Sequence, residues 1–330
     1  MVKTKKLLSV LMTAILIVTA LTSCGTQNGS DNEKIKIGII QLIKHAALDA
    51  AYEGFVEALK EDGYIDGENI EIDYQNAAGD QSNCQSIADK FVSDGKDLIL
   101  AIATPAAQAI AMKTTDIPIL VTAVTDPHDA GLVESNEKPG GNVSGTSDLT
   151  PVAEQMALLK ELFPEAQKVA VLYTSSEANS VFQANIAKEA ALAIGLETTD
   201  ATISNSNEIQ QVVSSVLESV DAIYAPTDNI IAAAMPTVVL AANEAKIPVI
   251  CGEEGMVEKG GLITYGINYF NLGKMTGKQA VKVLKGADIS AMPIEYLSTV
   301  SLETTINKET AAAIGFEFPA SILEKAKTVE

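Results

Sequence analysis

The sequence predicts an α/β protein made of two doubly wound parallel-sheet lobes that a hinge joins. Short apolar runs alternate with segments that carry a helical stripe, which is typical of parallel strands covered by helices on both faces. The pattern also occurs twice, because DLILAIATPAAQAIA followed by DIPILVTAV resembles DAIYAPTDNIIAAA followed by KIPVICGEE. With 330 residues, 47% of them apolar, the chain is long enough to bury two cores.

The first residues indicate a secretory leader. Lys3, Lys5 and Lys6 precede the uncharged run LLSVLMTAILIVTALTS, which is at the short end of the roughly 17 to 25 residues that a transmembrane helix needs. The residues LTSC that end at Cys24 resemble the lipobox of bacterial lipoproteins. That resemblance implies cleavage before Cys24 and a lipid on its thiol. We predict a signal peptide over 1–23 and a lipidated cysteine with a flexible tether over 24–34.

The strands and helices of the body follow from periodicity. The run KIKIGIIQLI is a predicted strand, and the next helix has Leu48, Ala51, Tyr52, Phe55 and Leu59 at helical spacing. Further strands are predicted, in order, at IEIDY, DLILAIA, IPILVTAV, KVAVLY, DAIYAPT, IPVICG and LITYGIN. A second helical stripe consists of Ile209, Val212, Val213, Val216 and Val220.

The join between the two lobes is expected near residues 139–151. This segment, PGGNVSGTSDLTP, contains two adjacent glycines and a polar cluster that suit a crossover which must bend. After Asn268 the chain supplies one more helix and further strands, so we expect it to complete both lobes. The predicted N-terminal lobe is 35–145 with about 268–295, and the C-terminal lobe is 146–267 with about 296–330.

Composition excludes several classes of function. The chain has 43 acidic and 23 basic residues, a formal net charge of -20, so it lacks the excess of positive charge that nucleic-acid binding needs. The motifs G-x-S-x-G, G-x-x-x-x-G-K-[ST], G-x-G-x-x-G and H-E-x-x-H are absent. With two histidines, and with Cys84 and Cys251 expected to be unpaired packing residues, a His/Cys metal site is not expected. We therefore predict no enzyme, cofactor or metal.

Candidate ligand-binding residues lie in the strand-to-helix turns, because ligands of open α/β sheets bind beyond the carboxyl ends of the strands. Thr104 and Ser175 stand at expected helix starts, where each could bind a carboxylate or simply cap its helix. Asp228 could pair with a ligand ammonium or be an N-cap, and His45 could face the ligand or pack. The predicted set is Gln41, His45, Thr104, Ala106, Ala107, Thr125, Asp126, Ser175, Ser176, Asn179, Thr227, Asp228, Asn229 and Asn268.

Several segments together carry a family resemblance. They are KHAALDAAYEGFVEAL, DGYIDGENIEIDYQNAAGDQS, AVTDPHDAGLV, KPGGNVSGTSDL, VLYTSSEANS, PTDN, YFNLGKMTGKQAVKVLKGA and TINKETAAAIG. In this order they are similar to the substrate-binding lipoproteins of ABC importers of the tryptophan/tyrosine type. The resemblance implies a type I periplasmic-binding fold, an aromatic amino acid as ligand, and an ABC permease with its ATPase as partners. One departure, Ala46 where the family usually has proline after the histidine, leaves the ligand open.

From this resemblance we expect a monomer, lipid-anchored to the outer face of the bacterial cell membrane. Two other functions stay open. The same fold could bind a sugar or a nucleoside, although 5% aromatic residues and no tryptophan offer few rings for stacking. A lipid-anchored sensor or enzyme is the other alternative.

Overall fold

The computed structural model describes residues 34–298 and 301–329. Ile35–Glu330 form one compact unit, which contains all the helices and strands named below. Cys24, the signal peptide and residues 25–33 of the tether lie outside the described residues, so the predictions made for them remain predictions.

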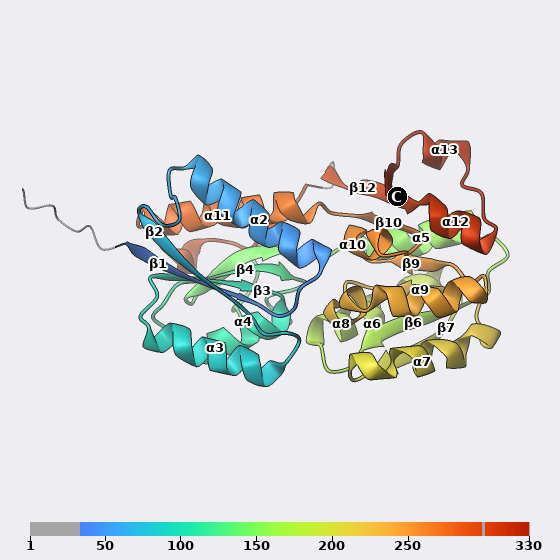
Figure 1. Cartoon of the computed structure of the whole chain (residues 1–330), viewed down its shortest axis with the longest axis horizontal. Coiled ribbons are helices and arrows are strands. Elements are labelled where there is room, and N and C mark those ends of the chain that lie inside the picture. The colour runs from blue at the N-terminus through green and yellow to red at the C-terminus, as the bar shows by residue number, and fades with distance from the viewer. Residues whose placement is uncertain (1–33, 299–300, 330) are drawn as a thin grey trace, which may run out of the picture. The chain divides into compact units, whose positions relative to one another are not determined.

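Among the described residues, the first sheet has six strands, all parallel; Figure 1 labels four of them, β1 to β4. Ile35 of the first strand pairs with Ile70 on one side, and Ile37 pairs with Leu98 on the other. In spatial order the strands are β11 (Glu295–Tyr296), β5 (Val143–Ser147), β4 (Ile119–Val124), β3 (Leu98–Ile102), β1 (Ile35–Gln41) and β2 (Ile70–Asn76). The carboxyl ends of β1, β3 and β4 therefore lie at one edge of this sheet.

Four α-helices cover the two faces of the first sheet. They are α2 (Ala46–Glu61) and α11 (Tyr269–Leu284) on one face, and α3 (Gln81–Ser93) and α4 (Thr104–Ala111) on the other (Figure 1). In α2 the predicted stripe is inward, since Leu48, Ala51, Phe55 and Leu59 are buried, whereas Tyr52 is half-buried. A short 3-10 helix, η3 (Ile289–Ala291), precedes β11.

The second sheet has seven strands. Their order is β13 (Lys327–Val329), β12 (Glu303–Asn307), β10 (Ile263–Gly266), β9 (Val249–Cys251), β8 (Ala222–Ala225), β6 (Lys168–Thr174) and β7 (Glu197–Ile203). The pair β10 and β12 is antiparallel, and the other neighbours are parallel. The predicted class, two doubly wound α/β lobes, is confirmed.

Buried side chains fill both faces of the second sheet, around Tyr224 and Met256 for example. The helices of this lobe are α5 (Val152–Leu162), α6 (Ala178–Ala193), α7 (Ile209–Val216), α8 (Asn229–Ala233), α9 (Met235–Glu244), α10 (Glu254–Glu258), α12 (Lys308–Ile314) and α13 (Ala320–Leu323). Two 3-10 helices, η1 (Ser206–Glu208) and η2 (Leu217–Ser219), flank α7.

Helices α2 and α11 approach each other closely because glycines stand at their contact. A Cβ on Gly273 would overlap the carbonyl oxygen of Ala51, and a Cβ on Gly54 would overlap that of Phe270. At Gly277 the nearest atom to such a Cβ would be the Cβ of Ala58, at 2.6 Å. The two backbones therefore pack directly against each other.

The chain passes between the sheets three times: after β5, after β10 and after β11. The segment 139–151 was expected to be a crossover, but residues Val143–Ser147 form the inner strand β5, and the chain leaves the first sheet just after it. The polar β5 is buried because its hydroxyls have partners: Ser144 Oγ donates to the Met292 carbonyl at 2.8 Å.

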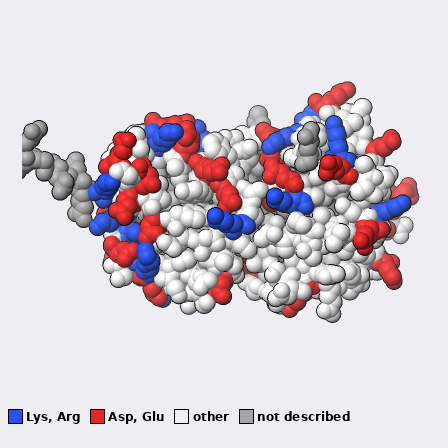
Figure 2. All heavy atoms as spheres, viewed as in Figure 1, with Lys and Arg blue, Asp and Glu red and all other residues white. Residues whose placement is uncertain are grey.

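Other features of the described residues bear on the predictions. Cys84 and Cys251 are free and buried, which confirms that they are unpaired packing residues. Among residues 34–298 and 301–329, no helix is long and apolar enough to cross a membrane, and no group of side chains is arranged to hold a metal ion. On the face shown in Figure 2, lysines are scattered among acidic side chains.

Candidate functional site

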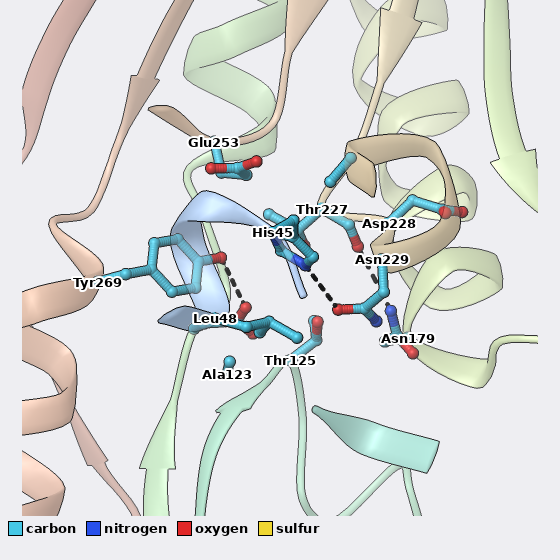
Figure 3. Close-up of a pocket in the computed structure, with 12 residues that line it drawn as sticks. His45, Leu48, Ala123, Thr125, Asn179, Thr227, Asp228, Asn229, Glu253 and Tyr269 are labelled. Carbon is cyan, nitrogen blue, oxygen red and sulfur yellow. Dashed lines mark hydrogen bonds between the residues drawn. The ribbon is translucent and has the colours of Figure 1, made fainter. Parts of the chain in front are cut away.

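A small pocket lies where the carboxyl ends of strands from both sheets meet. Its volume is about 10 Å³, roughly what one water molecule requires. Figure 3 shows His45, Glu253 and Tyr269 around it. The lining residues are His45, Leu48, Ala123, Thr125, Asp148, Asn179, Thr227, Asp228, Asn229, Ala232, Glu253 and Tyr269.

Direct contacts between the lobes close this pocket. Gln183 Nε2 donates to Thr125 Oγ1 at 2.9 Å, and His45 Nε2 lies 3.3 Å from Asn229 Oδ1. At Gly255, in the first turn of α10, an added Cβ would be 2.9 Å from the Cβ of Ala46. Because the pocket is this small, a larger ligand can enter only when the lobes move apart.

The hydrogen bonds of Asn229 define the proton position on His45. Asn229 Nδ2 donates to Glu177 Oε2 at 2.5 Å, so Asn229 Oδ1 is the acceptor toward the imidazole. Burial lowers the pKa of His45 to about 4, so the ring is neutral at pH 7. Its Nε2 therefore carries the hydrogen, and its buried Nδ1 is a lone-pair acceptor with no partner among the described residues.

Asp148 provides a second unused acceptor. Its Oδ2 accepts a hydrogen bond from the Tyr269 hydroxyl at 2.7 Å, whereas its buried Oδ1 has no partner within the described part of the chain. Burial raises the pKa of Asp148 to about 6, and the hydrogen bond from Tyr269 opposes this rise. At pH 7 the carboxylate is mostly ionised, and a cation beside Oδ1 would stabilise it further.

Glu253 places a third carboxyl group at the pocket. It is the N-cap of α10, where its side chain accepts from the amides of Gly255 at 2.5 Å and Met256 at 2.9 Å. Burial raises the pKa of Glu253 to about 8, although both amide hydrogen bonds lower it. Among the described residues, Asp148 Oδ1 and His45 Nδ1 are therefore free acceptors of the pocket, and they suit a ligand with a cationic N–H group.

The raised pKa of Glu253 predicts a specific pH dependence of stability. Between pH 4.5 and about 8 the unfolded chain loses this proton while the folded chain keeps it, so the free energy of unfolding falls as pH rises, by at most about 1.4 kcal/mol per pH unit. Glu253→Gln cannot ionise, and we expect its stability relative to the wild type to increase from pH 5 to pH 8. Urea unfolding at both pH values measures this.

The exposed Glu161→Gln is the control, since it also removes one negative charge. If the free energies of unfolding of both variants change with pH as that of the wild type does, Glu253 does not hold its proton in the folded state.

Strained backbone marks the ends of two neighbouring strands of the first sheet. Ala103, after β3, has φ 81°, and Ala123, in β4, has φ 53°; such residues cluster at functional sites. Thr104 begins α4, a helix without a side-chain cap, and its buried Oγ1 has no partner among the described residues. An unpaired hydroxyl beside free helix amides suits a carboxylate.

Some of the predicted residues come together in the pocket and others do not. Those that line it are His45, Thr125, Asn179, Thr227, Asp228 and Asn229. Thr104, Ala106 and Ala107 are buried at the start of α4. Gln41 is buried beside them at the end of β1, where its Nε2 donates to Ile43 O and Asp49 Oδ1.

The carboxylate of Asp228 was expected to face the cleft as the ammonium partner, or else to cap a helix. Figure 3 shows it turned away from His45 and Tyr269. Its Oδ1 accepts from the Ile231 amide and the Thr174 hydroxyl, both at 2.9 Å, and its Oδ2 accepts from the Thr174 amide at 2.6 Å. In this structure Asp228 is therefore an N-cap of α8 and ties α8 to β6.

Of the other four predicted residues, Ser176 lines a larger cavity beside the pocket, whereas the side chains of the other three are hydrogen-bonded to nearby backbone groups. Ser175 and Ser176 were expected at a helix start, but α6 begins at Ala178, and the Ser175 hydroxyl donates to Ile203 O at 3.1 Å. Asp126 Oδ1 accepts from His128 and Asp129 amides in its own loop. Asn268 caps α11 through the Asn271 amide, at 2.9 Å.

Sequence reasoning missed Asp148, Glu253 and Tyr269. Asp148 begins the crossover after β5, and Tyr269 follows the crossover after β10. Neither residue stands in a strand-to-helix turn of one repeat, and the two lie 121 positions apart in the chain. Glu253 directly follows the repeated run IPVICG, so its position after a predicted strand was the available signal.

Comparison with known proteins places this geometry in context. Residues 36–330 match the family model described as ABC transporter substrate binding protein. A tyrosine-binding protein of Clostridioides difficile is 46% identical over 327 residues, which are 96% of this chain and 94% of that protein.

Two solved structures are also similar. One is a domain from Streptococcus pneumoniae in complex with L-Trp. It is 40% identical in sequence, it superposes with a TM-score of 0.86, and the match covers 90% of this chain and 100% of that one. The other is the ligand-free, open structure of a substrate-binding protein with adhesive properties from Clostridium difficile. It is 49% identical in sequence, it superposes with a TM-score of 0.69, and the match covers 89% of this chain and 99% of that one. The open structure has the higher identity but the lower TM-score.

Proposed function

Because this chain belongs to the family of ABC transporter substrate-binding proteins, we propose that its ligand is an aromatic amino acid, held between the two lobes and delivered to an ABC permease. The protein acts outside the cytoplasm, as the binding proteins of ABC importers do. It binds its ligand without chemical change, and it does so as a monomer. The observation that carries the proposal is the acceptor-rich pocket between two lobes of this family.

The similar proteins support the ligand class. The 46% identical relative is a tyrosine-binding protein, and the structure with TM-score 0.86 holds L-Trp. Since the open structure fits less well despite its higher identity, the lobes of this chain are arranged more like those of the L-Trp complex. The direct contacts of His45 and Gln183 across the lobes support the same arrangement.

The ligand's two charged groups have candidate partners on the first lobe. In the proposal, the ammonium lies beside Asp148 Oδ1 and His45 Nδ1, both of which are buried acceptors that lack a partner among the described residues. The carboxylate lies at the start of α4, near the Thr104 hydroxyl. This assignment replaces the pairing with Asp228, whose oxygens have three donors. Charge-assisted hydrogen bonds of this kind contribute roughly 1.5 to 3 kcal/mol each.

Calorimetry tests the ligand class. Residues 25–330 contain the whole compact unit and correspond to chains that were solved on their own, so this body can be purified, unfolded to remove ligand and refolded. It is titrated with L-tyrosine, L-tryptophan, L-phenylalanine, L-leucine, ribose and a nucleoside. We expect tight one-to-one binding of an aromatic amino acid, recovered chemically unchanged. Heat only with ribose or the nucleoside would overturn the ligand assignment.

We also propose that the lipid anchor is Cys24. The residues LTSC follow an apolar leader and match the lipobox pattern, and a thiol is needed for the lipid transfer. Cys24→Ser is expected to remove lipid labelling and to release the mature protein from the membrane fraction, or to leave it uncleaved. Radiolabelled fatty acid and fractionation measure this. Ser23→Ala, which keeps the cysteine, is the control, and lipid on the Cys24→Ser protein would contradict the assignment.

A further inference from the structure

A chamber of about 550 Å³ lies beside the pocket, also between the lobes. The same segments line both cavities. Leu42 and Ile43 line the chamber just before His45 of the pocket, and Ile230 lines it just after Asn229. The pocket and the chamber are therefore neighbouring parts of one cleft.

Apolar side chains and polar, mostly uncharged side chains share the wall of the chamber. Leu42, Ile43, Pro105 and Ile230 supply apolar surface, and Glu177 is the one charged residue among those that line it. Apolar surface next to polar side chains suits an aromatic ring that carries a hydrogen-bonding group, and such a ring offers about 150 to 250 Å² to bury. The pocket, in contrast, contains the hydrogen-bonding groups suited to the charged end of an amino acid.

Glu177 connects the two cavities. It is 4% exposed. Its Oε2 accepts from Asn229 Nδ2 at 2.5 Å and from Asn179 Nδ2 at 3.3 Å, and both asparagines line the pocket. Its Oε1 is buried and, among the described residues, has no hydrogen-bond partner. A buried polar atom without a partner is costly, so a ligand group that pairs with it gains affinity.

We propose that the chamber binds the side chain of the captured amino acid, and that Glu177 selects rings that carry a hydrogen-bonding group. The phenol O–H of tyrosine and the indole N–H of tryptophan can both donate to Oε1, whereas the phenyl ring of phenylalanine has no hydrogen-bond donor. A protonated Glu177 can also donate to a phenol oxygen, so tyrosine finds a partner in either protonation state. The inference rests on the proposed function, because it assumes an aromatic amino acid as ligand.

The test compares three ligands on two variants. Residues 25–330 of the wild type, Glu177→Leu and Glu177→Gln are titrated with L-tyrosine, L-tryptophan and L-phenylalanine. We expect the wild type to prefer tyrosine over phenylalanine by about tenfold or more. Glu177→Leu is expected to remove most of this preference, and Glu177→Gln, which keeps a donor and an acceptor, to retain it.

Binding of phenylalanine shows whether Glu177 selects between rings or only holds Asn179 and Asn229 in place. If Glu177→Leu weakens all three ligands equally, Glu177 acts through Asn179 and Asn229, and the selection proposal is overturned. An unchanged preference for tyrosine overturns it as well. If the wild type binds none of the three, the proposed function itself has failed, which is a different result from a failed selection by a functional binding protein.

Filling the chamber tests its role without touching Glu177. Ala233 of α8 lines the chamber and is exposed, so Ala233→Phe is expected to fold and to weaken binding of all three aromatic amino acids about tenfold or more. Ala313→Phe, at an exposed position of α12, is the matched control. Equal affinities for the two variants would exclude the chamber as the side-chain subsite.

Discussion

Asp148→Ala is expected to weaken amino-acid binding by about 100-fold or more. The substitution removes the carboxylate whose Oδ1 we assign to the ligand ammonium, and loss of one partner of a buried charge pair costs about 3 to 5 kcal/mol. Because Asp148 is 4% exposed and accepts from Tyr269, some stability is lost too. Asp148→Asn keeps the shape and the hydrogen bond from Tyr269 but removes the charge, and we expect it to bind almost as weakly.

Substitutions of two other aspartates, Asp126 and Asp228, show whether the effect is specific to Asp148. Asp126→Ala is the control, because that side chain caps its own loop and we expect its removal to leave affinity within a few-fold of the wild type. Calorimetric titration of folded protein, checked by circular dichroism, measures all variants. If Asp148→Ala binds like the wild type while Asp228→Ala does not, the ammonium partner is Asp228 and our assignment is wrong.

Gly273→Val is expected to destabilise the first lobe strongly. Its side chain would enter the space that the Ala51 backbone occupies, and since this neighbour is the backbone of α2, it cannot rotate away. Overpacking of a core commonly costs about 1 to 3 kcal/mol, and a forced separation of two helices costs more. We expect a loss of about 3 kcal/mol or more in the free energy of unfolding, or no soluble protein.

Gly141→Ala is the matched control, because no heavy atom of the described residues lies within 4 Å of a Cβ at that position. Urea unfolding of both variants gives the comparison, and Gly273→Ala provides a milder substitution if the valine variant does not fold. Equal stability of Gly273→Ala and Gly141→Ala would show that α2 and α11 can separate at little cost.

The fold could be predicted from the sequence because its signals are local and repeated. Apolar runs such as DLILAIA have the length and the bounds of buried parallel strands, and the two copies support each other. The strand β5 could not be found in this way, because VSGTS is polar. It is buried because Ser144 and Thr146 find partners on distant segments, Met292 and Thr276.

The site was less predictable because hydrogen bonds decide which turn residues remain available. Asp126, Asp148 and Asp228 all follow strands, and the sequence does not distinguish them. In the structure Asp126 and Asp228 are bound by amides of nearby turns and strands, whereas Asp148 keeps an oxygen without a partner among the described residues. That difference depends on Tyr269 and on the crossover after β5, which only the three-dimensional arrangement brings together.

Because α11 lies late in the chain but packs on the first sheet, the first lobe is completed late in synthesis. Leu48, Ala51 and Phe55 of α2 belong to a core that α11 completes, yet α11 begins at Tyr269 of 330 residues. The N-terminal lobe therefore cannot finish folding when β5, which ends at Ser147, leaves the ribosome, although the N-terminal part of a chain usually folds first. Most of the second lobe is made before the first is complete, so the first lobe lacks part of its core until synthesis is nearly over.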